Sequence, residues 1–298
     1  MGEKMINRLM ERVVKGFSWI CAMVLLGTVL CILGYLLVNG FGTLNGNLIF
    51  GGTDPLDALL FRKQVFDGLF PAMIGTFSLV ALSVSFAVPI GLAAGIYMAE
   101  YCRGTLKKVF SLFFDVLAGI PSIVVGLFGF SIAIFLHNYF SSRIYPCLFI
   151  SALSLAFLVL PYLIRTTQVS LENLPEDIRR TAPTLGATKL QNIFYVLIPR
   201  SLSGIASGVI LSIGRCAEDT AVIMLTGVVA TAGVPKSVFS NYEALPFYIY
   251  YISSQYTDRQ ELLSGYGAAI ILLIICGVLF MMAFFIKHRL TYRAFYRP

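Results

Sequence analysis

Six apolar stretches, each about long enough to cross a bilayer, decide what this chain can fold into. A helix needs about 20 apolar residues to span the hydrocarbon core, and only helices or closed barrels satisfy every backbone polar group there. The chain is 58% hydrophobic and only 12% charged, against about 25% charged residues in soluble domains. We therefore predict an all-α, polytopic membrane protein that forms one domain over residues 1–298. Its six transmembrane helices are expected at residues 17–38, 71–99, 111–136, 146–164, 202–230 and 266–286.

Cationic residues are distributed unevenly among the segments that connect these stretches. Of the 22 lysines and arginines, sixteen lie in the alternate segments that include both chain ends, five lie in the other segments, and Arg215 lies within the fifth stretch. Because Lys and Arg concentrate in cytoplasmic loops, this bias predicts that both termini are cytoplasmic, with residues 1–16 as a tail. The net charge of +7 therefore does not indicate nucleic-acid binding.

Motifs for catalysis or cofactor binding do not occur in the sequence. It has no Gly-Lys dipeptide, which excludes a G-x-x-x-x-G-K-[ST] phosphate loop, and neither H-E-x-x-H nor G-x-S-x-G is present. The six cysteines include no C-x-x-C pair, and four of them lie inside apolar stretches, as small buried hydrophobic residues do. We expect no enzyme activity, no metal site, no cofactor and no catalytic residue in this chain. If ATP is used, ATP and Mg must be bound by a partner subunit.

Two pairs of glycines at a spacing of four residues predict close helix packing. They are Gly91 with Gly95 in the second stretch and Gly204 with Gly208 in the fifth. Small residues at this spacing let two helix backbones approach each other within a membrane. The pattern therefore predicts a tight bundle.

A polar segment at residues 171–201, between the fourth and fifth stretches, is predicted to form two short helices. Pro175 suits the first turn of a helix, and the acidic pair that follows it favours a helix N-terminus. Gly186 can adopt the left-handed conformation that often ends a helix. Thr188-Lys-Leu-Gln191 fits a capping box that opens a second helix. Both docking of a soluble partner and an ordinary structured loop are compatible with this pattern.

Ionised residues lie near the centre of the fifth stretch. An arginine there costs about 2.5–3.5 kcal/mol on insertion scales, so we expect Arg215 to face a cavity or a partner. Asp219 follows one helical turn later on the same face, where it can pair with Arg215. This pair either fixes helix packing or presents the forked donor of Arg215 to an oxyanion. Glu218 is expected to point elsewhere on the helix, where it adds a negative charge that an anion path does not obviously require, and its role is left open at this point.

Residues 179–199, RRTAPTLGATKLQNIFYVLIP, resemble the E-A-A…G…I-x-L-P loop of ABC importer permeases. Ala182, Gly186 and Pro199 match that pattern, whereas Arg180 and Thr181 replace its glutamate and first alanine. In that family the loop forms a coupling helix that inserts into a cleft of the ATP-binding subunit. The resemblance places the cytoplasmic coupling loop at 171–201 and assigns the contact to Arg179, Arg180, Thr181, Ala182, Leu185, Gly186, Ala187 and Thr188.

Other stretches resemble the phosphate-specific branch of these permeases. They are Gly75-Thr76, PIGLAAGIYMAEY at 89–101, DVLAGIPSIVVGLFG at 115–129 and GRCAEDTAVIM at 214–224. The last is similar to the run R-A-x-G-E-T-A of that branch, with Glu218 in place of its glycine and Asp219 in place of its glutamate. The resemblance implies the type I ABC importer permease fold, with its core at residues 71–286. It places the substrate pathway at Arg215, Glu218, Asp219 and Thr220.

The same resemblance implies a function and a set of partners. The chain is similar to PstA-type subunits more than to the paralogous PstC type, which implies ATP-driven import of inorganic phosphate across a bacterial inner membrane. The expected partners are a PstC-like permease, two PstB-like ATP-binding subunits, a periplasmic or extracellular PstS-like phosphate-binding protein, phosphate and membrane lipids, but not nucleic acid. Two alternatives remain: a permease for another oxyanion such as sulfate or molybdate, and a non-transporting membrane scaffold that recruits a soluble partner.

Overall fold

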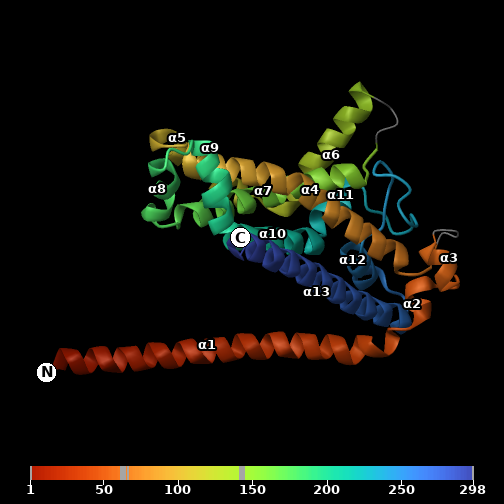
Figure 1. Ribbon diagram of the computed structural model, residues 1–298. Coiled ribbons are helices and arrows are strands. Elements are labelled where there is room, and N and C mark those ends of the chain that lie inside the picture. Colours follow the sequence, from red (N-terminus) through yellow and green to blue (C-terminus); the bar gives the residue numbers. More distant parts are fainter. Residues whose placement is uncertain (1, 61–64, 66, 141–144, 297–298) are drawn as a thin grey trace.

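The computed structural model describes residues 2–60, 65, 67–140 and 145–296, and within these ranges the chain is nearly all helical (Figure 1). The helices are α1 (Gly2–Gly40), α2 (Gly46–Phe50), α3 (Pro55–Leu59), α4 (Phe70–Glu100), α5 (Gly104–Ala118), α6 (Ser122–Tyr139), α7 (Leu148–Glu172), α8 (Glu176–Thr184), α9 (Lys189–Asn192), α10 (Ile198–Glu218), α11 (Ala221–Thr226), α12 (Leu245–Gln255) and α13 (Arg259–Tyr296). A 3₁₀ turn, Phe41–Thr43, follows α1, and a π-helical segment, Ile193–Leu197, joins α9 to α10.

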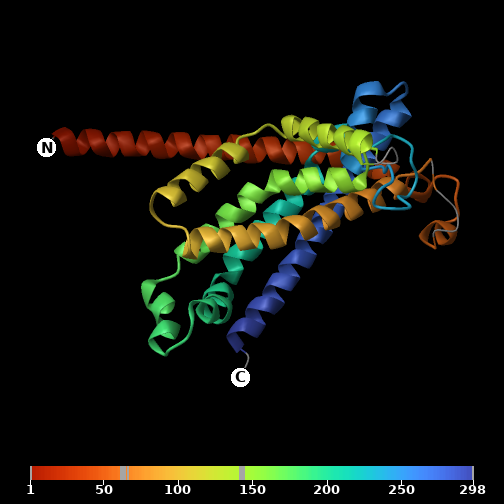
Figure 2. The ribbon, with the colours of Figure 1, turned by 90° about the horizontal axis from the view of Figure 1, so that it is seen from above.

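Six helical segments are long and apolar enough to cross a membrane, which confirms the predicted number of spans. The predicted spans at 17–38, 71–99 and 266–286 lie within α1, α4 and α13, respectively, and the one at 146–164 lies within α7 except for its first two residues. Figures 1 and 2 show α8, α9 and the two chain ends toward one end of the molecule, which we call the α8 end. Helices α2, α3 and α12 lie at the opposite end, called the α12 end.

The prediction of one continuous span at 111–136 is wrong. The chain leaves the helix after Ala118 and begins α6 at Ser122, so that only α6 is a candidate span in this region. Pro121 has no N–H to donate, and its ring disfavours a helical conformation at the residue before it; its backbone is extended, with ψ of 138°. Helix α5 is therefore separate from α6, and an ion pair between Lys107 and Glu172 at 2.7 Å attaches it to α7.

The prediction of a fifth span at 202–230 is also wrong in its boundaries. The span begins earlier, because the helix is continuous from Lys189 through the π-helical segment, and it ends at Glu218. Asp219 adopts an extended conformation, with ψ of 115°, and a short new helix, α11, follows. The helix axis is therefore interrupted directly after Arg215 and Glu218.

Helix α7 lies at the centre of the bundle, and about two-thirds of its most apolar window is buried, against a third or less in the other spans. Glycines of α4 (Gly91, Gly95) and of α10 (Gly204, Gly208) face it on two sides. A Cβ added to Gly95 would lie 2.5 Å from the Cβ of Thr167 on α7, which is closer than two carbon atoms can pack. The predicted close packing at both glycine pairs is confirmed, and α7 is the partner of both.

The segment between α11 and α13 is fastened to the α12 end of the bundle. The carboxylate of Glu243 accepts backbone N–H groups of Ala232 at 2.8 Å and Gly233 at 2.7 Å. The hydroxyl oxygen of Thr76, on α4, accepts the N–H of Leu245 at 2.9 Å. Burial raises the pKa of Glu243, an effect that these two N–H groups oppose. Two N–H groups of this segment are thus paired by its own Glu243, and Thr76 of α4 holds the start of α12 against the bundle.

Helix α1 is the least attached span. Its last residue, Gly40, packs against Tyr266 and Ile270 of α13, and the rings of Tyr35 and Tyr266 meet edge to face at 5.8 Å. The most apolar window of α1 is fully unburied within the chain, and Figure 1 shows the helix running apart from the bundle. The main cluster of buried apolar side chains draws on α4, α6, α7, α10, α11 and α13.

The glycine packing predicts that Gly95→Ala destabilises the fold, while the same change at Gly27 of α1 does not. An added methyl at residue 95 must displace Thr167, and overpacking of this kind costs about 1–3 kcal/mol; Gly27 has no neighbour within 4 Å. Thermal unfolding of the purified chain in detergent measures both variants. Equal melting temperatures for the two would contradict the packing described here.

Candidate functional site

One face of α10 carries a stripe of polar residues that the rest of the chain leaves uncovered. The exposed residues along this face are Arg200, Ser203, Ser207, Leu211, Arg215 and Glu218. Charged side chains within a membrane-spanning helix are unfavourable against lipid and normally face a water-filled cavity or a protein partner. The stripe therefore marks the side of α10 that faces a path or a second subunit.

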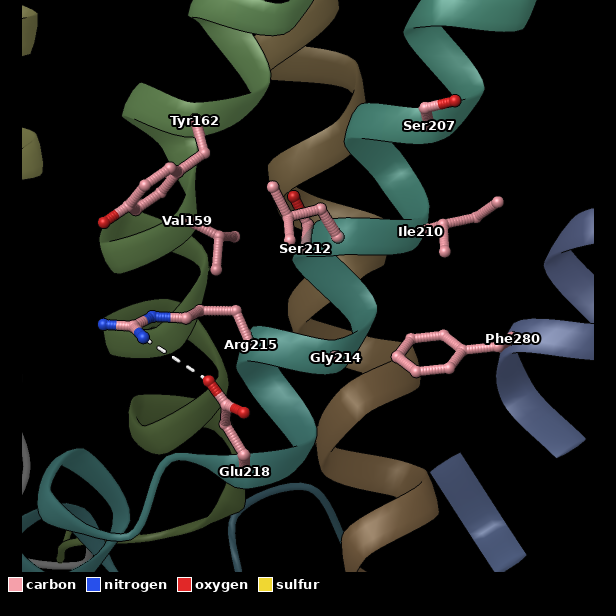
Figure 3. A pocket seen from close by; sticks show the side chains of 10 residues that line it. Val159, Tyr162, Ser207, Ile210, Ser212, Gly214, Arg215, Glu218 and Phe280 are labelled. Carbon is pink, nitrogen blue, oxygen red and sulfur yellow. Dashed lines mark hydrogen bonds and ion pairs between the residues drawn. The ribbon is translucent and has the colours of Figure 1, made fainter. Parts of the chain in front are cut away.

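A cavity of about 510 Å³ opens on this stripe between α7, α10 and α13. In Figure 3, Arg215 extends from α10 toward α7, where Tyr162 and Val159 lie, and Phe280 of α13 approaches from the opposite side. The hydroxyl of Tyr162 donates to the backbone carbonyl of Ala118, the last residue of α5, at 3.3 Å. Three spans thus line this cavity, and the break after α5 contacts one of its lining residues, Tyr162.

Arg215 is paired with Glu218 rather than with the predicted partner. A guanidinium N–H of Arg215 donates to a carboxylate oxygen of Glu218 at 3.4 Å, and the two side chains are 43% and 66% exposed. Exposed ion pairs contribute only about 0.2–1 kcal/mol. A guanidinium has five N–H donors in a fixed fork, so most of its donor capacity remains for an oxyanion that enters the cavity.

The predicted pair of Arg215 with Asp219 is wrong, because the helix ends between them. An Asp219 carboxylate oxygen accepts the backbone N–H of Val222 at 2.9 Å, which is the geometry by which Asp caps a helix start. Asp219 is buried, and Thr220 stands at the start of α11. Of the four predicted pathway residues, Arg215 and Glu218 line the cavity, whereas Asp219 and Thr220 form the junction with α11.

A second cavity extends the first along α7 and α10 and brings in a residue that the sequence analysis did not select. It is a shallow, open depression of about 330 Å³ that adjoins the first cavity at Ser207 and Leu211, and we call the two together the groove. Arg165 of α7 lines this second part and donates to the hydroxyl of Ser111 at 3.0 Å. The spacing of Tyr162 and Arg165, three residues apart on a helix, is the sequence signal that could have placed Arg165 beside the groove.

The two short helices predicted between the fourth and fifth spans are confirmed as α8 and α9. Gly186 has φ of +85° after the end of α8. Thr188 and Gln191 form both bonds of the predicted capping box, with the Thr188 N–H donating to the Gln191 side chain at 2.8 Å. Pro183, in the last turn of α8, has no N–H to donate to the carbonyl of Arg179 four residues earlier, and that carbonyl instead accepts the side-chain amide of Asn192 at 2.9 Å. This local sequence chemistry fixes the turn between α8 and α9.

The predicted contact residues of α8 and the following turn do not all face the same way. Arg180, Thr181, Leu185, Gly186 and Thr188 are exposed, and the Leu185 side chain is 84% exposed. Ala182 and Ala187 are partly buried. Arg179 turns toward the bundle, where it forms an ion pair with Glu100 of α4 at 3.0 Å. The outward set forms a protruding surface at the α8 end, and Arg179 belongs to the attachment of that surface.

Comparison with known proteins gives a family match and a set of relatives. Residues 91–291 match the family described as binding-protein-dependent transport system inner membrane component. The phosphate transport system permease protein PstA 1 of Mycobacterium tuberculosis is 33% identical over 235 residues, which cover 78% of this chain and 74% of that protein. The PstA of Haemophilus influenzae is 32% identical over 220 residues, covering 73% and 76%, respectively.

Solved structures of importer permeases share the fold. A chain of the methionine ABC transporter MetNI, in an inward-facing conformation, superposes with a TM-score of 0.57 at 16% identity, covering 80% of this chain and 100% of that chain. A chain of a bacterial alginate ABC transporter superposes with a TM-score of 0.63 at 18% identity, covering 92% and 95%. The likeness confirms the predicted type I ABC importer permease fold.

The capping role of Asp219 predicts different results for two substitutions at that position. Asp219→Asn keeps a side-chain oxygen for the Val222 N–H and should leave the melting temperature nearly unchanged. Asp219→Ala removes the cap and should cost about 0.5–2 kcal/mol of stability. Thermal unfolding in detergent distinguishes the two. A large loss in both variants would instead indicate that the negative charge of Asp219 is required, as an ion pair would demand.

Proposed function

The chain belongs to the family of binding-protein-dependent transport system inner membrane components, and from this premise we propose that it is a permease subunit of an ATP-driven importer of inorganic phosphate. The observation that carries the proposal is the groove along α7 and α10, where Arg215 presents its guanidinium in a chain whose curated relatives are phosphate permeases. No bond chemistry is assigned to this chain, and ATP and Mg would be bound by partner subunits.

Arg215 has the donor geometry that recognition of phosphate requires. The planar fork of a guanidinium matches two oxygens of a tetrahedral oxyanion, and its positive charge persists at every physiological pH. The weak exposed contact with Glu218 holds the guanidinium in the groove when no anion is present. An arriving phosphate replaces this carboxylate, and the returning Glu218 then competes with phosphate for Arg215. This exchange gives Glu218 a role, because a transported anion must leave as well as bind.

The open side of the groove supports pairing with a second permease. The polar stripe of α10 is uncovered in this chain, whereas a membrane-spanning protein needs such residues shielded from lipid. A homologous permease would close the groove so that phosphate passes between the two subunits. A soluble binding protein would deliver phosphate at the α12 end.

The protruding surface of α8 and α9 supports docking of ATP-binding subunits. Leu185, in the turn after α8, and Leu190, in α9, are 84% and 59% exposed, respectively. Exposed apolar side chains of this size, gathered at one end, mark an interaction surface. The segments at the α8 end also hold the excess of lysines and arginines. Both the exposed apolar surface and this charge bias support a cytoplasmic location of the α8 end in a bacterial inner membrane.

We predict that Arg215→Gln and Glu218→Gln change phosphate uptake in opposite ways. Loss of the guanidinium should raise the KM for phosphate at least about tenfold, since a bond to a charged group contributes about 1.5–3 kcal/mol. Loss of the Glu218 carboxylate should lower KM about two- to fivefold, as expected for removal of an exposed pair, and should also lower kcat because release slows.

Uptake of labelled phosphate by the assembled complex in proteoliposomes measures both effects, with ATP hydrolysis recorded in parallel. Lys15→Gln removes an exposed cation of α1 far from the groove and serves as the control. An Arg215→Gln complex that hydrolyses ATP and takes up phosphate with an unaltered KM would contradict the assignment. Competition by sulfate or molybdate equal to that by phosphate would shift the substrate to another oxyanion.

A further inference from the structure

Arg179 joins four helices at the α8 end. One nitrogen of its guanidinium pairs with a carboxylate oxygen of Glu100, the last residue of α4, at 3.0 Å. The other donates to the carbonyl of Leu171 near the end of α7 at 2.6 Å. The side-chain amide of Asn192, in α9, donates to the backbone carbonyl of Arg179 at 2.9 Å. One residue of α8 therefore forms an ion pair with α4 and hydrogen bonds with α7 and α9.

This arrangement is shielded from solvent, unlike the neighbouring ion pair of the same helix. The side chains of Arg179 and Glu100 are 25% and 11% exposed, and Leu171 and Asn192 are buried. Arg180 pairs with Glu176 of its own helix, and both side chains are about three-quarters exposed. A shielded pair is weakened little by salt and leaves an uncompensated charge when one partner is removed.

Within the described residues, α8 packs mainly on α9 and the π-helical segment, and its polar bonds to α4 and α7 are those of Arg179. Helix α9 adds a second attachment to the same place. The ammonium of Lys189 donates to the backbone carbonyl of Glu100 at 2.5 Å and lies 4.1 Å from the ring centroid of Tyr101. The C-terminal end of α4 is thus the point where both short helices are held.

Helix α4 connects this point with the opposite end of the molecule. Its 31 residues give a length of about 46 Å at 1.5 Å per residue. Gly91 and Gly95 lock it against α7, and Thr76 binds the segment that carries α12. A displacement of α8 that is transmitted through Glu100 would therefore move α4 and α7 together and reach the segment at the α12 end.

We propose that Arg179, through its ion pair with Glu100, is the positioning residue that transmits movement of α8 to the membrane-spanning helices. The proposal rests on the function proposed above, in which α8 and α9 receive movement from ATP-binding subunits. It separates the roles of two adjacent arginines: Arg180 belongs to the docking surface, and Arg179 links that surface to α4. Loss of the link leaves docking and ATP hydrolysis in place but reduces the phosphate moved for each ATP hydrolysed.

The test compares variants of the assembled complex in proteoliposomes by phosphate uptake, ATP hydrolysis and their ratio. Arg179→Gln and Glu100→Gln should each lower the ratio at least about fivefold, the lower range of typical coupling between sites. The double variant should be no worse than either single variant, because both remove the same bond. Lys107→Gln breaks a comparable ion pair, between α5 and α7, and should leave the ratio unchanged.

The possible outcomes separate this inference from the proposed function. A wild-type complex that shows no ATP-dependent phosphate uptake would overturn the proposed function. If the wild type transports, a ratio within twofold of wild type in Arg179→Gln would overturn the role of Arg179. If Arg179→Gln does not assemble, Glu100→Gln decides, because it keeps Arg179 and its bond to Leu171. Multiplying losses in the double variant would show two independent structural effects and would also overturn the proposal.

Discussion

The close packing of α4 and α10 against α7 is the constraint on which the rest of the structure depends. Lipid offers no hydrophobic drive for helix association, so membrane helices associate where small residues let backbones come together. Glycines of α4 and α10 meet Leu163, Thr166, Thr167 and Ser170 of α7. This contact sets the position of α10, and hence of the groove that contains Arg215. It also makes α4 and α7 one unit, to which α8 attaches through Arg179.

Two interruptions of the spans lie beside the groove that we propose as the phosphate path. The break around Pro121 lets the end of α5 meet Tyr162 at the groove, and the break at Asp219 ends α10 just after Arg215 and Glu218. Irregular backbone at membrane depth is tolerated where protein buries it or water reaches it. Asp219 accepts the backbone N–H of Val222 in the first turn of α11, which pairs one of the donors that the break leaves without a helical partner. The ionised residues consequently stand at the end of a helix, beside a cavity.

Interactions between residues close in sequence made much of the fold predictable. The predictions that failed concern where a helix ends and how two helices pack. The number of spans, the capping box of Thr188 and the turn at Gly186 follow from patterns within a few residues, and the structure confirms them, whereas the predicted bounds of the third and fifth spans are wrong. The pair of Arg215 with Asp219 assumed an unbroken helix, but a carboxylate can cap a new helix instead. Arg165 was missed because a cation at the end of an apolar stretch looks like part of a loop. Only the packing of α7 against α10 shows that it lines the groove.

The central claim is that water and phosphate share the groove between α7 and α10, and thiol accessibility measures this most directly. Ser207→Cys places a thiol on the wall that both cavities share, and Ile274→Cys places one on an exposed apolar face of α13. In the assembled complex, a charged thiol reagent should modify residue 207 beyond the background of the native cysteines, and phosphate should slow this reaction. Residue 274, facing lipid, should not react. Equal reactivity at the two positions, or a rate at residue 207 that phosphate leaves unchanged, would contradict the account.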